Sequence, residues 1–228
     1  IERAAEAGGA RVLPAGAITK GRKGEELAEL AMMAEAGAVA FTDDGAWVQD
    51  SGIMRRALEY SLATGRPIVS HAEDKTLSAG GYAHWGPTAL KLGMEGVPRE
   101  AEEIAVYRDL ALAELTGARL HLQHLSSAGS GGLVRLAKAS GVRVTAEATP
   151  HHLLFNDTVL EKFDTNYKVN PPIREEADRK ALVQGLLDGT IDAIATDHAP
   201  HSALEKSLEF PYAPGGIAWL EIAFPALY

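Results

Sequence analysis

Five short segments of the sequence place carboxylate and imidazole side chains close together. They are Thr-Asp-Asp-Gly (42–45), Ser-His-Ala-Glu-Asp (70–74), Gln-His-Leu-Ser-Ser (123–127), Glu-Ala-Thr-Pro-His-His (147–152) and Thr-Asp-His-Ala-Pro-His (196–201). Four of them offer a possible metal ligand, namely Asp43 or Asp44, His71, His124 and Asp197. Imidazole and carboxylate suit Zn²⁺ and its neighbours, and one carboxylate can bridge two cations about 3.5–4 Å apart. A single histidine in such a position is more often structural, but the four together favour a metal site.

The remaining histidines are weaker candidates for catalysis or metal binding. His198 and His201 follow Asp197, which is a candidate base, and His201 is the better candidate for substrate contact because it lies past the turn. We expect His151 and His152 to lie behind the ligands or to cap a loop. The other two are interpreted structurally, with His84 in a solvated Gly-rich loop (80–86) and His121 in the core of a strand.

The elements that must position these residues alternate along the chain. Six candidate strands span residues 11–19, 38–42, 67–71, 118–125, 142–148 and 191–197, and five of them end in the polar segments above. Helical spacing of apolar residues is found at 27–34, at 104–111 and from about Arg174 to Gly189. Apolar strands between helices are typical of a parallel sheet covered on both faces.

Polar residues at five strand ends decide between two α/β architectures. A doubly wound sheet binds its ligand at one switch point, whereas a (β/α)8 TIM barrel gathers functional residues from several strand ends. We therefore predict a barrel. A full barrel has eight strands and about 250 residues, so residues 1–228 are expected to form a partial barrel domain with about six of the eight strands.

Composition excludes several classes of protein. The 31 acidic and 22 basic residues give a formal net charge of -9, which argues against nucleic acid as a partner. Cysteine is absent, so a metal would have to be bound by histidine, aspartate or glutamate. No apolar run reaches the roughly 20 residues of a membrane helix, and the start, Ile1-Glu2-Arg3, is no signal peptide. We expect a cytoplasmic protein that does not bind membranes, and a chain that is a piece of something longer.

Six segments in register along the whole chain resemble the bacterial dihydroorotases of the amidohydrolase superfamily. They are Phe-Thr-Asp-Asp-Gly (41–45), Ser-His-Ala-Glu-Asp (70–74), Gln-His-Leu-Ser-Ser (123–127), Thr-Pro-His-His (149–152), Lys-Val-Asn-Pro-Pro-Ile-Arg (168–174) and Thr-Asp-His-Ala-Pro-His (196–201). The resemblance implies a (β/α)8 barrel holding a zinc pair. It implies Asp44 as the bridging ligand, His71 and His124 on one metal, and Asp197 on the other.

Details of the resemblance narrow the branch of the superfamily. Hydantoinases and allantoinases bridge their metals with a carbamylated lysine on the fourth strand, whereas the corresponding strand here ends in two aspartates. Asp44 is therefore similar to the bridge of the branch that lacks this lysine, with Asp43 as the alternative. Asn170 and the Pro-His that follows Asp197 also resemble dihydroorotase, which implies a dihydropyrimidine substrate that carries a carboxylate.

The sequence departs from the family pattern in two places. The His-x-His pair of the family's first strand and the arginine that follows it are absent from these 228 residues, so the site is incomplete and the chain alone is expected to be inactive. The family's Phe-Gly after the eighth strand reads Gly215-Gly216. We expect backbone contacts with substrate to be kept there and an aromatic wall to be lost.

The resemblance implies a reaction in pyrimidine biosynthesis, the reversible closure of N-carbamoyl-L-aspartate to L-dihydroorotate. Two Zn²⁺ ions would activate water, Asp197 would move the proton, and Asn170, His201, Gly215 and Gly216 would hold the substrate. A homo-oligomer is expected, and aspartate transcarbamoylase is a further candidate partner. Two alternatives stay open, namely a catalytically silent structural partner of aspartate transcarbamoylase and a related cyclic-amide hydrolase of the hydantoinase or allantoinase type.

Overall fold

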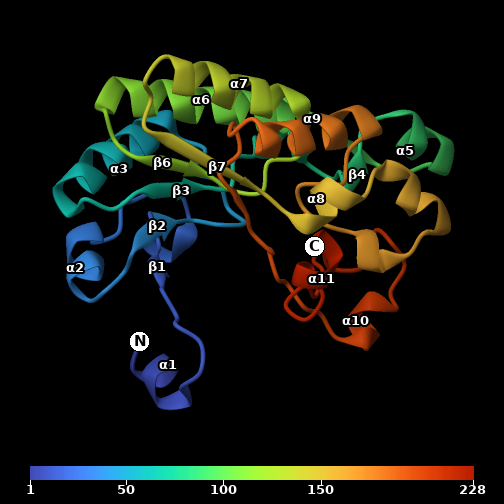
Figure 1. Cartoon of the computed structure of the whole chain (residues 1–228), viewed down its shortest axis with the longest axis horizontal. Helices are drawn as coiled ribbons and strands as arrows, with labels where there is room; N and C mark the ends of the chain where they lie inside the picture. Colours follow the sequence, from blue (N-terminus) through green and yellow to red (C-terminus); the bar gives the residue numbers. More distant parts are fainter.

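The computed structural model describes all 228 residues around a six-stranded parallel sheet. The strands, in their spatial order, are β1 (Ala15–Gly16), β2 (Ala40–Thr42), β3 (Ile68–Ser70), β6 (Leu120–Leu122), β7 (Val144–Ala148) and β8 (Ala193–Ile194). Every neighbouring pair is parallel (Figure 1). Each strand lies within one of the six predicted ranges, and the predicted parallel sheet is confirmed.

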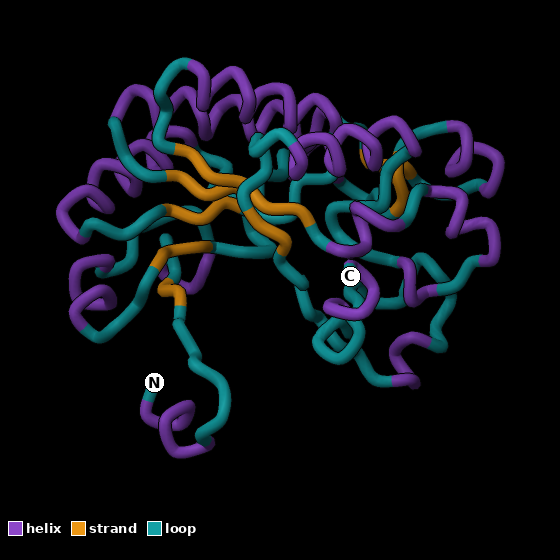
Figure 2. The backbone as a smooth tube through the Cα atoms, viewed as in Figure 1, coloured by secondary structure: helices purple, strands orange, loops and turns teal.

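Five helices cover one face of this sheet. They are α2 (Leu30–Glu35), α3 (Ser51–Thr64), α6 (Glu100–Thr116), α7 (Ala128–Ala139) and α9 (Glu176–Leu187). Figure 2 shows helices gathered on one side of the strands. Side chains alternate along a strand, so Leu120 and Leu122 are buried against the helices while His121 lies on the opposite face. The predicted cover of helices is therefore present on one face only, and the other face is the concave inside of the incomplete barrel.

The helix ends follow from local chemistry. Asp50 and Ser127 cap α3 and α7 by accepting backbone hydrogen bonds from Ile53 and Ser130. Gly65 ends α3 in the left-handed conformation that glycine adopts without steric cost. The helix expected from about Arg174 begins instead at Glu176, because the Arg174 side chain is buried and bonds to Ser126 Oγ and the Val97 carbonyl.

A small second sheet contradicts the interpretation of residues 80–86 as a solvated loop. β4 (Ala83–His84) pairs in parallel with β5 (Gly96–Val97). The helix α4 (Lys75–Ser78) precedes β4, and α5 (Pro87–Leu92) connects the two strands. His84 is 1% exposed, so the expectation that it is solvated is wrong. The reason is close packing, since a Cβ on Gly81 would lie 2.5 Å from Val97 Cγ2. The glycine therefore allows close backbone contact and does not indicate a solvated loop.

The remaining elements are short. The 3-10 helix η1 (Lys20–Arg22) follows β1, and α8 (Pro150–Leu154), η2 (Asp157–Lys162) and η3 (Thr165–Tyr167) follow β7. α10 (Ala203–Lys206) and α11 (Ala223–Leu227) come after β8. The first helix, α1 (Glu2–Ala7), has no buried residue and stands apart from the sheet in Figure 1. No helix has the length and apolar character needed to cross a membrane.

Candidate metal centre at the strand ends

Three predicted ligands converge at the carboxyl ends of neighbouring strands. Asp44 lies two residues after β2, His71 directly after β3, and His124 two residues after β6. Asp44 Oδ1 is 3.3 Å from His71 Nδ1 and 3.7 Å from His124 Nε2, and the two imidazole nitrogens are 2.8 Å apart. Ligand atoms about 2.0–2.1 Å from a tetrahedral zinc are roughly 3.3 Å apart. The three atoms therefore fit a single cation.

The two aspartates at the end of β2 have different surroundings. Asp43 is buried, and its carboxylate accepts hydrogen bonds from the backbone N–H of Ile18 (2.8 Å) and Thr19 (3.1 Å) and from the Thr19 hydroxyl. These bonds tie the end of β1 to the end of β2. Asp44 instead meets both histidines, so the structure places Asp44, and not Asp43, in the position expected for a ligand.

Backbone conformation marks two of the predicted site residues. His124 has φ 33° and Asp197 has φ 44°, which is the left-handed region that residues with a Cβ rarely adopt. Such residues cost about 1–3 kcal/mol each and gather at functional sites, where the surrounding structure holds them. Both follow a strand by two or three residues, so the strain turns their side chains at the rim of the sheet.

The pKa values of the two site carboxyls move in opposite directions. Hydrogen bonds with His124 and His71 hold the pKa of Asp44 far below its usual value, so this side chain is ionised and ready to bind a cation. Burial raises the pKa of Asp197, the Asp44 charge adds to this rise, and the His124 and His71 charges oppose it. Asp197 therefore holds a proton more readily than a free aspartate, but its carboxylate is not one of the three groups whose ligand atoms converge.

Glu73 is a site residue that the sequence reasoning missed. Its Oε2 lies 2.8 Å from His71 Nε2 and accepts hydrogen bonds from Lys75 and from Asn170 Nδ2, the latter at 2.9 Å. Because His71 Nδ1 faces Asp44 and His124, its Nε2–H is free to donate to Glu73. A carboxylate on the far nitrogen of a ligating histidine fixes its tautomer and orientation. The signal was the spacing His-x-Glu inside a segment already singled out.

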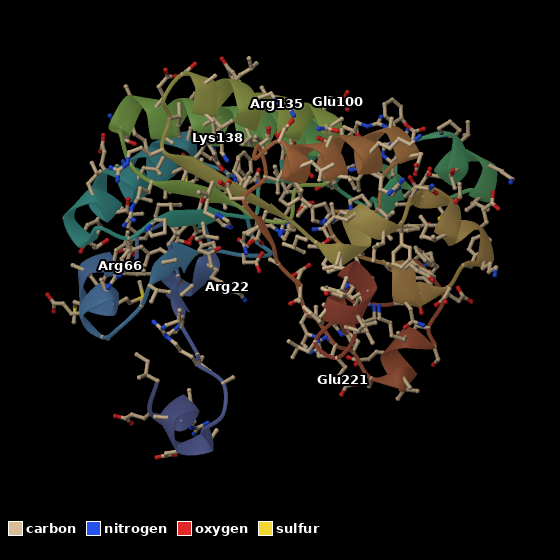
Figure 3. The ribbon with its side chains drawn as sticks, in the orientation of Figure 1. Arg22, Arg66, Glu100, Arg135, Lys138 and Glu221 are labelled. Atoms are coloured by element: carbon tan, nitrogen blue, oxygen red, sulfur yellow. The ribbon has the colours of Figure 1, made fainter.

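Arg22 is a second missed neighbour of the site. Its Nη1 donates a hydrogen bond of 3.1 Å to the carbonyl oxygen of Asp44, and its own backbone is left-handed at φ 57°. Figure 3 labels it next to β1, toward the middle of the molecule. This contact holds the backbone of the loop that carries Asp44.

The predicted substrate residues lie together on two adjoining loops. His201 Nε2 is 3.0 Å from the carbonyl oxygen of Gly215, and the Gly216 N–H donates to the Lys168 carbonyl at 2.8 Å. Asn170 lies two residues after Lys168 in the sequence, and its Nδ2 is 3.4 Å from His71 Nε2. Gly216 has φ 143°, and a Cβ there would lie 2.5 Å from the Ala199 carbonyl oxygen, so this position requires glycine.

The other histidines have structural partners. The His151 Nδ1 accepts a hydrogen bond from Trp219 Nε1, and His152 Nε2 lies 3.0 Å from the Pro171 carbonyl. His198 Nδ1 accepts from the Trp219 and Leu220 N–H groups, so it anchors the C-terminal segment. His121 bonds to Thr145 and Glu147, but on the concave face and partly exposed, so its expected place in the core is wrong.

Fold and site together define a class, the amidohydrolase-type barrel with ligands at the ends of its parallel strands. Two similar solved structures are the L-hydantoinase of Arthrobacter aurescens (TM-score 0.79, 26% identity, 94% of this chain and 50% of that chain) and the dihydroorotase of Saccharomyces cerevisiae (TM-score 0.72, 18% identity, 94% and 60%). They confirm the predicted (β/α)8 fold, of which six strands are present here.

A family model described as dihydro-orotase-like matches residues 2–130, and the chain belongs to this family. The dihydroorotase of Syntrophobacter fumaroxidans is 56% identical over 227 residues, which are 100% of this chain and 52% of that protein. The dihydroorotase of Geobacillus thermodenitrificans is 53% identical over 218 residues, or 96% and 51%. The chain thus spans about half the length of the curated relatives it matches.

Proposed function

We propose that residues 1–228 form a partial amidohydrolase barrel domain, which is the metal-binding part of a dihydroorotase. The whole protein would interconvert N-carbamoyl-L-aspartate and L-dihydroorotate. The observation that carries this proposal is the convergence of Asp44, His71 and His124 within 2.8–3.7 Å of one another. The 51–56% identity to proteins named dihydroorotase supports it.

The available ligands suit zinc. Asp44, His71 and His124 would hold one ion, and Asp197 would contribute to a second. When bound, the metal would lower the pKa of a water and polarise the amide carbonyl of the ring. His71 and His124 are 4% exposed, whereas the Asp44 side chain is 44% exposed. The site is therefore open to a ligand from the side of Asp44 and closed behind the histidines.

In this proposal Asp197 moves the proton. Its carboxylate takes the proton of the attacking water and returns it to the ring nitrogen that leaves, which is general base and then general acid catalysis. Burial favours the protonated form of Asp197, as its raised pKa shows. A group that gains and loses a proton in turn is helped by a pKa closer to neutrality than that of a free aspartate.

Substrate would be held by groups around the same opening. The Asn170 amide, the His201 ring and the Gly215 and Gly216 backbone offer hydrogen bonds to a carboxylate and a ring amide. Glu73 positions both Asn170 and His71, so it couples substrate binding to ligand orientation. Misplacement of a reacting group by about 1 Å can cost about a hundredfold in rate, which is why this shared anchor matters.

The test is a metal-dependent assay of the protein at its natural length. Protein stripped of metal with a chelator should not open L-dihydroorotate, and zinc added back should restore activity as two ions bind per active site. Metal content measured in the same samples links the two. Full activity of a metal-free sample would contradict the proposal.

A second candidate is a hydrolase for hydantoin-type rings, favoured by the structural similarity to the Arthrobacter aurescens L-hydantoinase. Against it stands the end of β2, where Asp43 and Asp44 are found and no lysine. Parallel assays with L-dihydroorotate and hydantoin decide between them, and faster turnover of hydantoin would select the second. Association with a second copy or with aspartate transcarbamoylase stays a prediction.

A further inference from the structure

Three arginines surround a pocket at the opposite end of the sheet from the metal centre. Arg66, Arg119 and Arg143 directly precede the first residues of β3, β6 and β7 or lie one residue farther upstream. Together with Ser61, Leu62 and Gly65 from the end of α3 they line a pocket of about 100 Å³. Figure 3 shows Arg66 beside α2 and α3, on the side remote from α10 and α11.

Strand register forces two of these cations together. Leu120 lies opposite Val144, and the Leu120 N–H donates to the Arg143 carbonyl oxygen at 3.0 Å. Arg119 therefore lies opposite Arg143, with both side chains on the same face of the sheet. Like charges directly opposite on neighbouring strands destabilise a sheet.

No carboxylate of the chain neutralises the three guanidinium groups. Arg99, Arg108, Arg135 and Arg179 all form ion pairs, but Arg66, Arg119 and Arg143 form none, in a protein with nine more acidic than basic residues. The single hydrogen bond from any of the three guanidinium groups is that of Arg143 Nη1 to the Gly117 carbonyl at 3.5 Å. All three side chains are exposed, so the remaining donors are accessible to a ligand from solvent.

Helix ends explain only part of this arrangement. Arg66 follows the end of α3, and Arg143 touches Gly117 at the end of α6, where a cation is favoured by the helix dipole. That interaction needs one cation at each helix end. It accounts neither for Arg119 nor for the meeting of all three side chains at one pocket.

We propose that this pocket binds the phosphate group of a small molecule. Guanidinium groups donate in a planar fork that matches phosphate oxygens, and a doubly charged anion between Arg119 and Arg143 would turn their repulsion into attraction. The pocket is small and polar, which suits a compact oxyanion. It lies at the amino ends of the strands and is separate from the metal centre, so the proposal does not depend on the proposed reaction.

The experiment is a calorimetric titration of the natural-length protein with inorganic phosphate and, separately, pyrophosphate. A chelator removes metal so that phosphate cannot bind at Asp44, and ionic strength is held constant with sodium chloride. Saturable binding of one anion per chain is expected. Stronger binding of pyrophosphate than of phosphate would identify a phosphorylated metabolite as the natural class, and the reverse would identify free phosphate.

Variants locate the binding. Arg119→Gln and Arg143→Gln should each raise the Kd about ten- to hundredfold, the worth of hydrogen bonds to a charged group. Arg119→Lys keeps the charge but loses the fork, so it should bind more weakly than the native protein and more tightly than Arg119→Gln. Arg56→Gln is the matched control, because Arg56 is an exposed arginine on α3 that lines no part of the pocket.

Two results would overturn the proposal. One is the absence of saturable binding by both anions to the native protein. The other is binding that the Arg119→Gln and Arg143→Gln variants retain at native strength. If a glutamine variant folds poorly, Arg119→Lys still decides, because it preserves the charge balance of the native strand.

Discussion

The two ends of the central sheet differ in how charge is balanced. At the carboxyl ends of β2, β3 and β6, Asp44 faces two imidazoles, and Glu73 supports one of them from behind. At the amino ends of β3, β6 and β7, three arginines meet without a counter-charge. The first arrangement is held together by hydrogen bonds within the chain, whereas in our proposal the second would be stabilised by a bound anion. Substitutions at the metal centre should therefore reduce activity, whereas substitutions of the arginines should raise the free energy of unfolding.

Removing two ligands should have the largest effect. Asp44→Ala with His124→Ala leaves His71 alone of the three converging groups, so zinc should be lost from that position and ring opening should fall by more than about 10⁴-fold, the upper worth of a single acid–base residue. Elemental analysis and the dihydroorotate assay measure both. Asp188→Asn, an exposed aspartate paired with Arg135, is the control. Stoichiometric zinc in the double variant would refute the ligand assignment.

Asp197→Asn should have the next largest effect. The change keeps the volume but removes the basic carboxylate, so kcat should fall by about 10²–10⁴-fold at saturating zinc. Bound metal is measured in the same sample to separate proton transfer from coordination. His201→Ala should instead raise KM more than it lowers kcat if His201 orients the substrate as proposed. Near-native kcat in an Asp197→Asn protein that holds both metals would remove Asp197 from catalysis.

Glu73→Gln tests whether the support behind the ligands matters. Glutamine keeps an acceptor near His71 Nε2 but loses the charge, so zinc affinity should fall about 10–100-fold. Competition with a zinc-binding dye gives the affinity. Glu161→Gln removes an exposed carboxylate paired with Lys91 and should change nothing. Unchanged zinc affinity would show that Asp44, His71 and His124 keep their arrangement without Glu73.

Gly216→Ala probes the loop that holds Gly215 against His201. The φ of 143° and the 2.5 Å approach to the Ala199 carbonyl both oppose a Cβ, so the free energy of unfolding should fall by about 1–3 kcal/mol. KM should rise because the loop must shift. Thermal denaturation and steady-state kinetics check the two effects. Gly131→Ala, inside α7 with open space around it, is the control: KM should not change, and helix propensity should raise the free energy of unfolding by up to about 1 kcal/mol. An unaffected KM would separate this loop from substrate binding.

The smallest effect is expected at the amino ends of the strands, with the opposite sign. In phosphate-free buffer Arg119→Gln removes the repulsion from Arg143 and should raise the free energy of unfolding by about 0.2–1 kcal/mol, because the Arg119 guanidinium forms no hydrogen bond or ion pair that would be lost. Denaturant titration measures this change. Adding phosphate should stabilise the native protein more than the variant. A variant less stable than the native protein in phosphate-free buffer would contradict the contrast between the two ends.

Several features were predictable from the sequence because they depend on local pattern. Apolar runs such as 38–42 and 118–125, each followed by polar residues, specify both the strand and the side chains at its end. Parallel strands then bring their carboxyl ends to one rim, which is why Asp44, His71 and His124 could be predicted as neighbours although 80 positions separate the first from the last. The helices beginning near Glu100 and Glu176 followed from periodicity for the same reason.

Packing decided the features that local pattern left open. The glycine-rich pattern around Gly81 predicted a loop, because the close contact of Gly81 with Val97 forms only when β4 and β5 pair. Asp43 and Asp44 are chemically identical, and the choice between them depends on which one the N–H groups of Ile18 and Thr19 reach, 24 to 25 residues away.

The sequence by itself therefore determined the six parallel strands and the set of residues at their ends, because these follow from short-range patterns of apolar and polar side chains, and the six segments that carry the resemblance determined the family. Only the tertiary structure decided which aspartate meets the histidines, that Glu73 supports His71, and that Arg119 stands opposite Arg143. The first and third depend on distances between atoms of different strands and loops, which are fixed by strand register and core packing. The spacing His-x-Glu brings Glu73 near His71 in the sequence, but only the folded segment shows that the carboxylate bonds to Nε2.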